Sequence, residues 1–170
     1  AERRGDLKPG YTIVEASTGN TAIALALLSK QKGYEIKVVI PEGVVPTMGD
    51  VLALYGAEVV RCEPQAGLKG AIELASQMAE KRGHYCLGQF YDSANVAAHY
   101  RTTGPEIVRA IPRVDVFVAG IGTGGTIMGV GGCLRESNPN VRVVGVEPRM
   151  GERLQGLRSL EEGHIPKLLD

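Results

Sequence analysis

Two short runs of glycine, hydroxyl and amide residues have the chemistry to bind anionic groups. The first is Ser17-Thr18-Gly19-Asn20-Thr21, and the second is Gly122-Thr123-Gly124-Gly125-Thr126. Backbone N–H groups in a glycine-rich turn, together with the positive end of a helix dipole, favour a phosphate or a carboxylate. These two runs are therefore where we expect binding chemistry.

The second run follows an apolar stretch that ends at Ala119, and its last residue, Thr126, begins another apolar stretch. This order predicts a buried strand, a turn and the first turn of a helix. A tight strand-to-helix turn with no ligand would also use glycine. However, positions 120–125 hold four glycines, and two threonine hydroxyls accompany them. The pattern favours a phosphate-type site.

The first run has two interpretations. Serine, threonine and asparagine are good residues for capping a helix N-terminus, and capping alone would account for them. Several hydroxyl and amide groups around one glycine, Gly19, exceed what a cap needs. Their second use is to hold a small carboxylate with hydroxyls and backbone N–H groups.

Strands and helices alternate along the chain, with short turns containing glycine or proline. This alternation predicts an α/β fold with parallel sheets and helices on both faces. The expected strands are 11–15, 35–40, 58–62, 84–87, 114–119 and 141–147. The expected helices are 20–32, 47–55, 68–82, 96–109 and 126–136, the fourth interrupted at Gly104-Pro105 because proline breaks a helix. The apolar stretch 22–28 predicts that the first of these helices is the most buried.

We predict two domains, a small one over 1–95 and part of a larger one over 96–170. The second has few strands for an independent core. Residues 1–10 resemble the last turn of a helix followed by a loop. Both features lead us to expect that the sequence is an internal portion of a longer protein.

In an open parallel sheet, ligands bind beyond the carboxyl ends of the strands. Each of the two runs follows a predicted strand at that end, one in each predicted domain. A ligand with a phosphate at one end and a carboxylate at the other would suit a cleft between them.

Composition excludes several classes of protein. The 170 residues carry 19 basic and 19 acidic side chains, so the chain lacks the basic surface that nucleic acids require. No apolar run approaches the length of a membrane span, and no signal segment is evident. Three widely spaced cysteines, Cys62, Cys86 and Cys133, fit neither a disulfide framework nor a metal site, which favours the cytoplasm.

Dinucleotide binding is a competing interpretation of the glycine-rich turn. Gly120–Gly125 satisfies the G-x-G-x-x-G pattern, and Glu147 ends the next predicted strand, where such folds keep a ribose-binding acid. The additional Gly124 and the threonines fit a single phosphate better. In addition, the first run has no role in a nicotinamide enzyme.

The residues resemble those of the fold-type II enzymes that use pyridoxal phosphate. The first run resembles their substrate loop and the second their cofactor-phosphate loop. Gln89-Phe90, Asn95 and the stretch 98–107 are similar to the cysteine synthases of that group. The stretches 54–58 and 156–167 look most like the B-type cysteine synthases. The likeness extends over essentially the whole chain.

The resemblance implies β-replacement on O-acetylserine or O-phosphoserine, with sulfide or another thiol as the second substrate and pyridoxal 5′-phosphate as cofactor. The cofactor residues implied are Gly122, Thr123, Gly124, Gly125 and Thr126 for the phosphate and Asn20 for the ring hydroxyl. The substrate residues implied are Ser17, Thr18, Gly19, Thr21 and Gln89 for the carboxylate, and Arg158 for a phosphorylated substrate, although a solvated surface arginine explains Arg158 equally well. Members of the family are commonly dimers.

Two departures from the family pattern qualify these expectations. Ala22 replaces a glycine after the first run and is expected to narrow the site. The family's Schiff-base lysine lies in a Ser-x-Lys-Asp-Arg type motif upstream of Tyr11, and the 170 residues contain no such motif. We therefore expect no catalytic residue in this chain and no β-replacement by it alone. A non-catalytic binding module and a nicotinamide-dependent oxidoreductase remain the alternatives.

Overall fold

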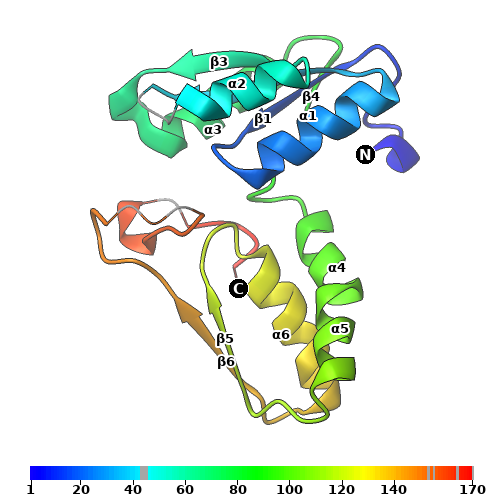
Figure 1. Cartoon of the computed structure of the whole chain (residues 1–170), viewed down its shortest axis with the longest axis vertical. Coiled ribbons are helices and arrows are strands. Elements are labelled where there is room, and N and C mark those ends of the chain that lie inside the picture. The colour runs from blue at the N-terminus through cyan, green and yellow to red at the C-terminus, as the bar shows by residue number, and fades with distance from the viewer. Residues whose placement is uncertain (43–45, 153, 155, 164, 170) are drawn as a thin grey trace. The chain divides into compact units, whose positions relative to one another are not determined.

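The computed structural model describes residues 1–42, 46–152, 154, 156–163 and 165–169. The chain divides into two compact units, Ala1–Gly88 and Gln89–Asp170 (Figure 1). The sequence predicted a division after residue 95, seven residues later. Asn95 makes its side-chain hydrogen bonds to Gln89 and Thr123, both in the second unit.

The first unit contains a four-stranded sheet in which every pairing is parallel, in the order β3-β2-β1-β4. Its strands are β1 (Thr12–Ala16), β2 (Glu35–Pro41), β3 (Glu58–Cys62) and β4 (His84–Cys86). Thr12 lies opposite Glu35 in β2 and His84 in β4, so β1 is a central strand. All five of its residues are buried.

Helices cover both faces of this sheet, as the apolar strands predict. They are α1 (Asn20–Lys32), α2 (Pro46–Leu54) and α3 (Gly67–Ala79). One core cluster joins Ile13 and Val38 of the sheet to Ala22 of α1 and Leu52 of α2. A second cluster joins the opposite face of the strands to the buried alanines of α3.

Helix α1 is not the most buried helix, so that prediction was wrong. Only one side of it packs on the sheet, through Ala22 and Ala26, while Leu27 and Leu28 are 40% and 47% exposed. The more buried helix is α6 (Gly125–Ser137), in which seven residues are buried. Glycines such as Gly129 let neighbouring helices approach it closely. An added Cβ there would collide with the Val96 carbonyl of α4 (Ala94–Arg101) and lie 2.8 Å from the backbone nitrogen of Tyr100.

The second unit contains α4, α5 (Thr103–Ala110), α6 and a parallel pair of strands, β5 (Val116–Gly120) and β6 (Arg142–Val146). Figure 1 shows α4 and α5 running beside α6. A core of Val130, Leu134 and Val141 fills the space between α6 and the strands. Three short 3₁₀ turns, Glu2–Arg4, Pro64–Ala66 and Leu160–Glu162, complete the described elements.

The predicted helix over 96–109 is two helices that meet at Thr102. The break falls before Gly104-Pro105 because the ring of a proline collides with the carbonyl four residues earlier. For Pro105 that carbonyl belongs to Arg101, the last residue of α4. Pro105 then lies in the first turn of α5, where its missing N–H costs nothing.

Candidate functional site

The first unit has a topological switch point between β1 and β4. The chain leaves β1 through α1 toward β2, whereas β4 lies on the other side of β1 and is reached through α3 on the opposite face. Crevices at such points, beyond the carboxyl ends of the strands, are where open α/β sheets bind ligands. Ser17–Thr21 follows β1 at this edge, and Leu87-Gly88 follows β4.

A buried carboxylate joins these two strand ends. Glu15 is 1% exposed. Its Oε2 accepts a hydrogen bond of 2.8 Å from the backbone N–H of Gly88, and its Oε1 accepts one of 3.2 Å from the N–H of Ala16. Glu15 thereby fixes the segment that precedes Gln89 against the strand that precedes Ser17. No local pattern indicates this role, because the Gly88 partner of Glu15 lies 73 residues away.

Ser17 organises its own loop. The side chain is buried, and its Oγ accepts hydrogen bonds from the N–H groups of Gly19 at 3.3 Å and Ala22 at 3.2 Å. Ser17 therefore binds the amide of the N-cap residue, Gly19, and one first-turn amide of α1, although Ser17 itself is not the N-cap. Its hydroxyl retains one proton for donation.

The rest of the first run lies closer to the surface. Thr18, Gly19 and Thr21 are half-buried, and Asn20 is exposed at the start of α1. Ala22 is fully buried in the core cluster of α1, α2 and the sheet. Its methyl group is packed in the core, so the expectation that it narrows the site was wrong.

In the second unit, the glycine-rich run connects β5 directly to α6. Gly124 caps α6 with φ = 86°, a left-handed conformation that glycine adopts without strain. The N–H of Gly125 donates to Thr123 Oγ1 at 3.3 Å, and the first intrahelical bond runs from the N–H of Met128 to the carbonyl of Gly124. The structure therefore confirms a strand, a glycine turn and a helix N-terminus.

Asn95 holds this turn from α4. Its amide nitrogen donates to Thr123 Oγ1 and to the backbone carbonyl of Gln89, both at 2.9 Å. Asn95 belongs to the segment that carries the family resemblance, but no local pattern links it to a threonine 28 residues later.

His99 holds the other threonine of the turn. Its Nε2 lies 3.1 Å from Thr126 Oγ1, and its Nδ1 lies 3.0 Å from Thr103 Oγ1 in α5. The imidazole ring therefore bridges α5 and the first turn of α6. The sequence did not assign a role to this residue either, because the bridge depends on how three helices pack.

Gln89 and Arg158, the remaining predicted substrate residues, both belong to the second unit and are half-buried. The guanidinium carbon of Arg158 lies 5.3 Å from the centre of the Phe90 ring, a cation–π contact. The backbone N–H of Arg158 donates to the carbonyl of Ile121 at 2.9 Å, which places it beside the glycine-rich turn. Arg158 is therefore held in place rather than freely solvated.

The groups at the start of α6 suit a phosphate. The helix is 13 residues long, and the first N–H groups of a helix have no acceptor within it. The threonine hydroxyls of Thr123 and Thr126 add donors, and the run carries no acidic side chain. Backbone donors, hydroxyls and the helix dipole together are the chemistry of a phosphate site, so the residues present fit the cofactor phosphate.

Glu147, the acid of the dinucleotide interpretation, accepts a hydrogen bond from the backbone N–H of Leu160. Two lysines are engaged in ion pairs of 2.8 Å, Lys32 with Glu2 and Lys37 with Glu58. The side chains of Lys8, Lys30, Lys69, Lys81 and Lys167 are exposed.

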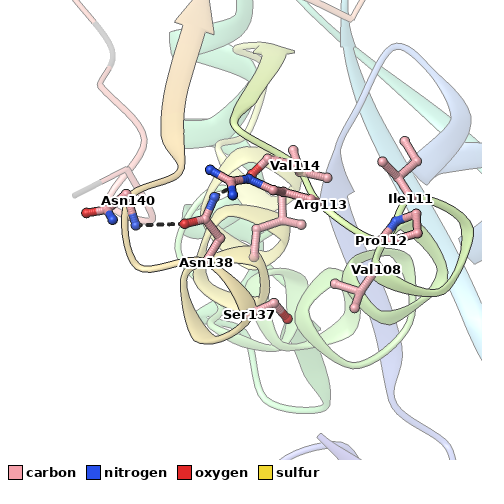
Figure 2. A pocket seen from close by; sticks show the side chains of 9 residues that line it. Val108, Ile111, Pro112, Arg113, Val114, Ser137, Asn138 and Asn140 are labelled. Carbon is pink, nitrogen blue, oxygen red and sulfur yellow. Dashed lines mark hydrogen bonds between the residues drawn. The ribbon is translucent and has the colours of Figure 1, made fainter.

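Each unit has a hollow at the amino ends of its strands, whereas the two predicted loops follow the carboxyl ends. One, of about 300 Å³, is lined by Arg113, Val114, Ser137 and Asn138 at the amino end of β5 (Figure 2). Its polar groups bond to one another: Asn138 donates to the carbonyl of Val114, and Arg113 pairs with Asp115 at 2.8 Å. The other, in the first unit, is lined by residues at the amino ends of β2 and β3. Neither contains a predicted site residue.

Within the described part of the chain, no three His, Cys, Asp or Glu side chains gather in a way that could hold a metal ion. No helix there is long and apolar enough to cross a membrane.

Parallel α/β units with a hydroxyl-rich loop at a switch point and a glycine turn opening a helix define a class of phosphate-binding α/β protein. Residues 1–168 match the family model described as "Pyridoxal-phosphate dependent enzyme". The chain therefore belongs to this family, whose cofactor is pyridoxal 5′-phosphate, and the resemblance to its fold-type II cysteine synthases is confirmed.

Individual relatives agree with this assignment. The chain is 39% identical to cysteine synthase B of Pseudomonas aeruginosa and 40% identical to a cysteine synthase of Staphylococcus aureus, in each case over all of its own length. The solved structure of O-ureido-L-serine synthase matches 99% of this chain with a TM-score of 0.91 at 36% identity, and the chain covers 56% of that structure. The chain spans 57% and 58% of the two curated relatives.

The buried carboxylate of Glu15 generates a stability prediction. Glu15→Ala should lower the free energy of unfolding by about 2–4 kcal/mol, because it removes the 2.8 Å acceptor of the buried Gly88 N–H and opens a cavity. Glu15→Gln, which keeps one acceptor oxygen, should cost less. Chemical denaturation of the 170-residue chain measures both.

Glu58→Ala, which removes an ion pair with an exposed carboxylate, is the control and should cost at most about 1 kcal/mol. Equal losses for Glu15→Ala and Glu58→Ala would contradict the role given to Glu15.

The conformation of Gly124 generates a second prediction. Gly124→Ala should lower the free energy of unfolding by about 1–2 kcal/mol, because a Cβ is unfavourable at a positive φ. Gly132→Ala is the matched control in the interior of the same helix, where the new methyl would meet the Tyr100 ring at an ordinary 3.5 Å. That change should instead stabilise the chain by about 0.5–1 kcal/mol. Thermal and urea unfolding measure both, and effects of the same sign would show that the turn is not as described.

Proposed function

We propose that the chain contributes the cofactor-phosphate and substrate-carboxylate sites of a pyridoxal-phosphate-dependent cysteine synthase. The reaction is replacement of the β-substituent of O-acetylserine or O-phosphoserine by sulfide or another thiol. Membership of the family and the cysteine synthases among the relatives support this reaction class. When bound, the cofactor supplies an electron sink for the bonds that break at the substrate's α- and β-carbons.

The observation that carries the proposal is the glycine turn at the start of α6. Gly122–Thr126 offers backbone N–H groups and hydroxyls at the positive end of a 13-residue helix, and its two threonines are held by Asn95 and His99. A phosphate gains most from such donors when they are fixed before it binds.

The substrate carboxylate is assigned to the first run and to Gln89. Ser17, Thr18, Gly19 and Thr21 offer hydroxyl and backbone donors at the switch point beyond β1, and Asn20, exposed at the first turn of α1, is assigned to the ring hydroxyl. Arg158 has the planar fork that suits a phosphorylated substrate. Its anchoring beside Ile121 supports O-phosphoserine as a substrate to test alongside O-acetylserine.

We further propose that the 170 residues bind the cofactor phosphate without catalysing β-replacement themselves. They contain no Ser-x-Lys-Asp-Arg type motif, and no proton-accepting lysine is assigned at either loop. In this form the chain acts as a module that binds the cofactor phosphate without catalysing the reaction. We also propose a dimeric state, as is common in the family, and a cytoplasmic location, which agrees with three cysteines that form no disulfide.

Ligand titration tests the cofactor assignment. The chain should bind pyridoxal 5′-phosphate about tenfold or more tightly than pyridoxal, because only the first carries the phosphate that the α6 turn recognises. Equilibrium dialysis measures both affinities, with NAD as a third ligand and Gly124→Ala as a site variant. Equal affinity for pyridoxal would contradict the phosphate site, and tighter binding of NAD would favour the dinucleotide interpretation.

The same samples test inactivity. With O-acetylserine, sulfide and the cofactor, the chain should form no cysteine above a protein-free control. A stoichiometric imine that borohydride reduces, or cysteine production, would overturn this part of the proposal.

A further inference from the structure

We propose that Asn95 is a positioning residue that links the cofactor-phosphate turn to the substrate-binding Gln89. The inference rests on the proposed function, because it takes the α6 turn as a phosphate site and Gln89 as a substrate ligand. Every contact that carries it lies within the second unit.

The orientation of the Asn95 amide follows from its partners. The backbone carbonyl of Gln89 can only accept a hydrogen bond, so the Asn95 atom that lies 2.9 Å from it must be the amide nitrogen. The same nitrogen lies 2.9 Å from Thr123 Oγ1, so Asn95 donates one proton to each. One half-buried side chain therefore connects the main chain of Gln89 to a hydroxyl of the turn.

These bonds determine what the Thr123 hydroxyl can offer a ligand. A hydroxyl has two acceptor positions and one proton. Asn95 and the N–H of Gly125 occupy both acceptor positions, at 2.9 and 3.3 Å. Among the described residues, no acceptor takes the Thr123 proton. The hydroxyl is thus set to donate, as an incoming phosphate oxygen requires.

Gly125 leaves the space that Asn95 fills. A Cβ built on Gly125 would overlap the side-chain amide of Asn95, and its nitrogen would lie only 2.8 Å away. The absence of a side chain at Gly125 therefore permits the contact, independently of any role in recognising phosphate. Gly125→Ala should displace Asn95 and reproduce the effect of removing its amide.

The arrangement couples the two functions of the second unit. A phosphate that takes the Thr123 proton polarises this hydroxyl and strengthens its bond from Asn95, which also holds the Gln89 carbonyl. Phosphate binding at the turn then changes the hydrogen bond that the Gln89 carbonyl accepts, and with it the environment of the Phe90 amide. In the absence of Asn95, the turn still binds phosphate, but less tightly and without an effect on that peptide.

Nuclear magnetic resonance of the ¹⁵N-labelled 170-residue chain tests this coupling. The probe is pyridoxine 5′-phosphate, which carries the phosphate but has no aldehyde to react with lysines. In the wild-type chain, the amides of Gly124 and Phe90 should shift with one dissociation constant. In Asn95→Ala, Gly124 should titrate about fivefold more weakly, the loss expected for one neutral hydrogen bond, and Phe90 should no longer respond.

Two further variants complete the experiment. Gly125→Ala should behave as Asn95→Ala does and replaces it if that variant fails to fold. Asn140→Ala, an exposed asparagine that precedes β6, should behave as wild type. A Phe90 response that survives in Asn95→Ala or Gly125→Ala, or an unchanged affinity, would overturn the inference while leaving the proposed function intact. Absence of binding to the wild-type chain would overturn both.

Discussion

The placement of the loop after β1 and of the segment after β4 depends on one buried carboxylate. Glu15 accepts hydrogen bonds from Ala16 and Gly88 and so ties the carboxyl end of β1 to the segment that follows β4. A buried charged or polar group is costly unless it is paired, and here the pairing is with the backbone itself. The strand that leads to Ser17 and the chain that leads to Gln89 consequently share one anchor.

In the second unit, side chains of α4 rather than a buried carboxylate hold the loop in place. The groups proposed to bind phosphate lie at the start of one buried helix, α6, and two side chains from α4 hold the hydroxyls of that turn. Close packing makes this possible, because an added side chain at Gly125 or Gly129 would collide with α4. These glycines permit the packing, and Gly125 also belongs to the turn proposed to bind phosphate. Preorganised donors of this kind favour a phosphate over water, since they need no rearrangement when it binds.

Local patterns in the sequence were enough to predict the elements and both loops. Helix α1 begins and ends where expected, at Asn20 and Lys32, because a capped apolar run followed by Gly33 defines both ends locally. The break at Thr102 follows from the stereochemistry of Pro105, although it was predicted too late in the chain. Glu15, Asn95 and His99 could not be found in this way, because their partners lie 73, 28 and 27 residues away and only tertiary packing brings them together.

We propose that the start of α6 binds the phosphate of pyridoxal 5′-phosphate. A crystal structure of the chain grown with this cofactor tests it most directly. Phosphate density is expected within hydrogen-bonding distance of the Thr123 hydroxyl and of the backbone N–H groups in the first turn of α6. Phosphate density in the hollow lined by Arg113 and Asn138, with none at the glycine turn, would contradict it.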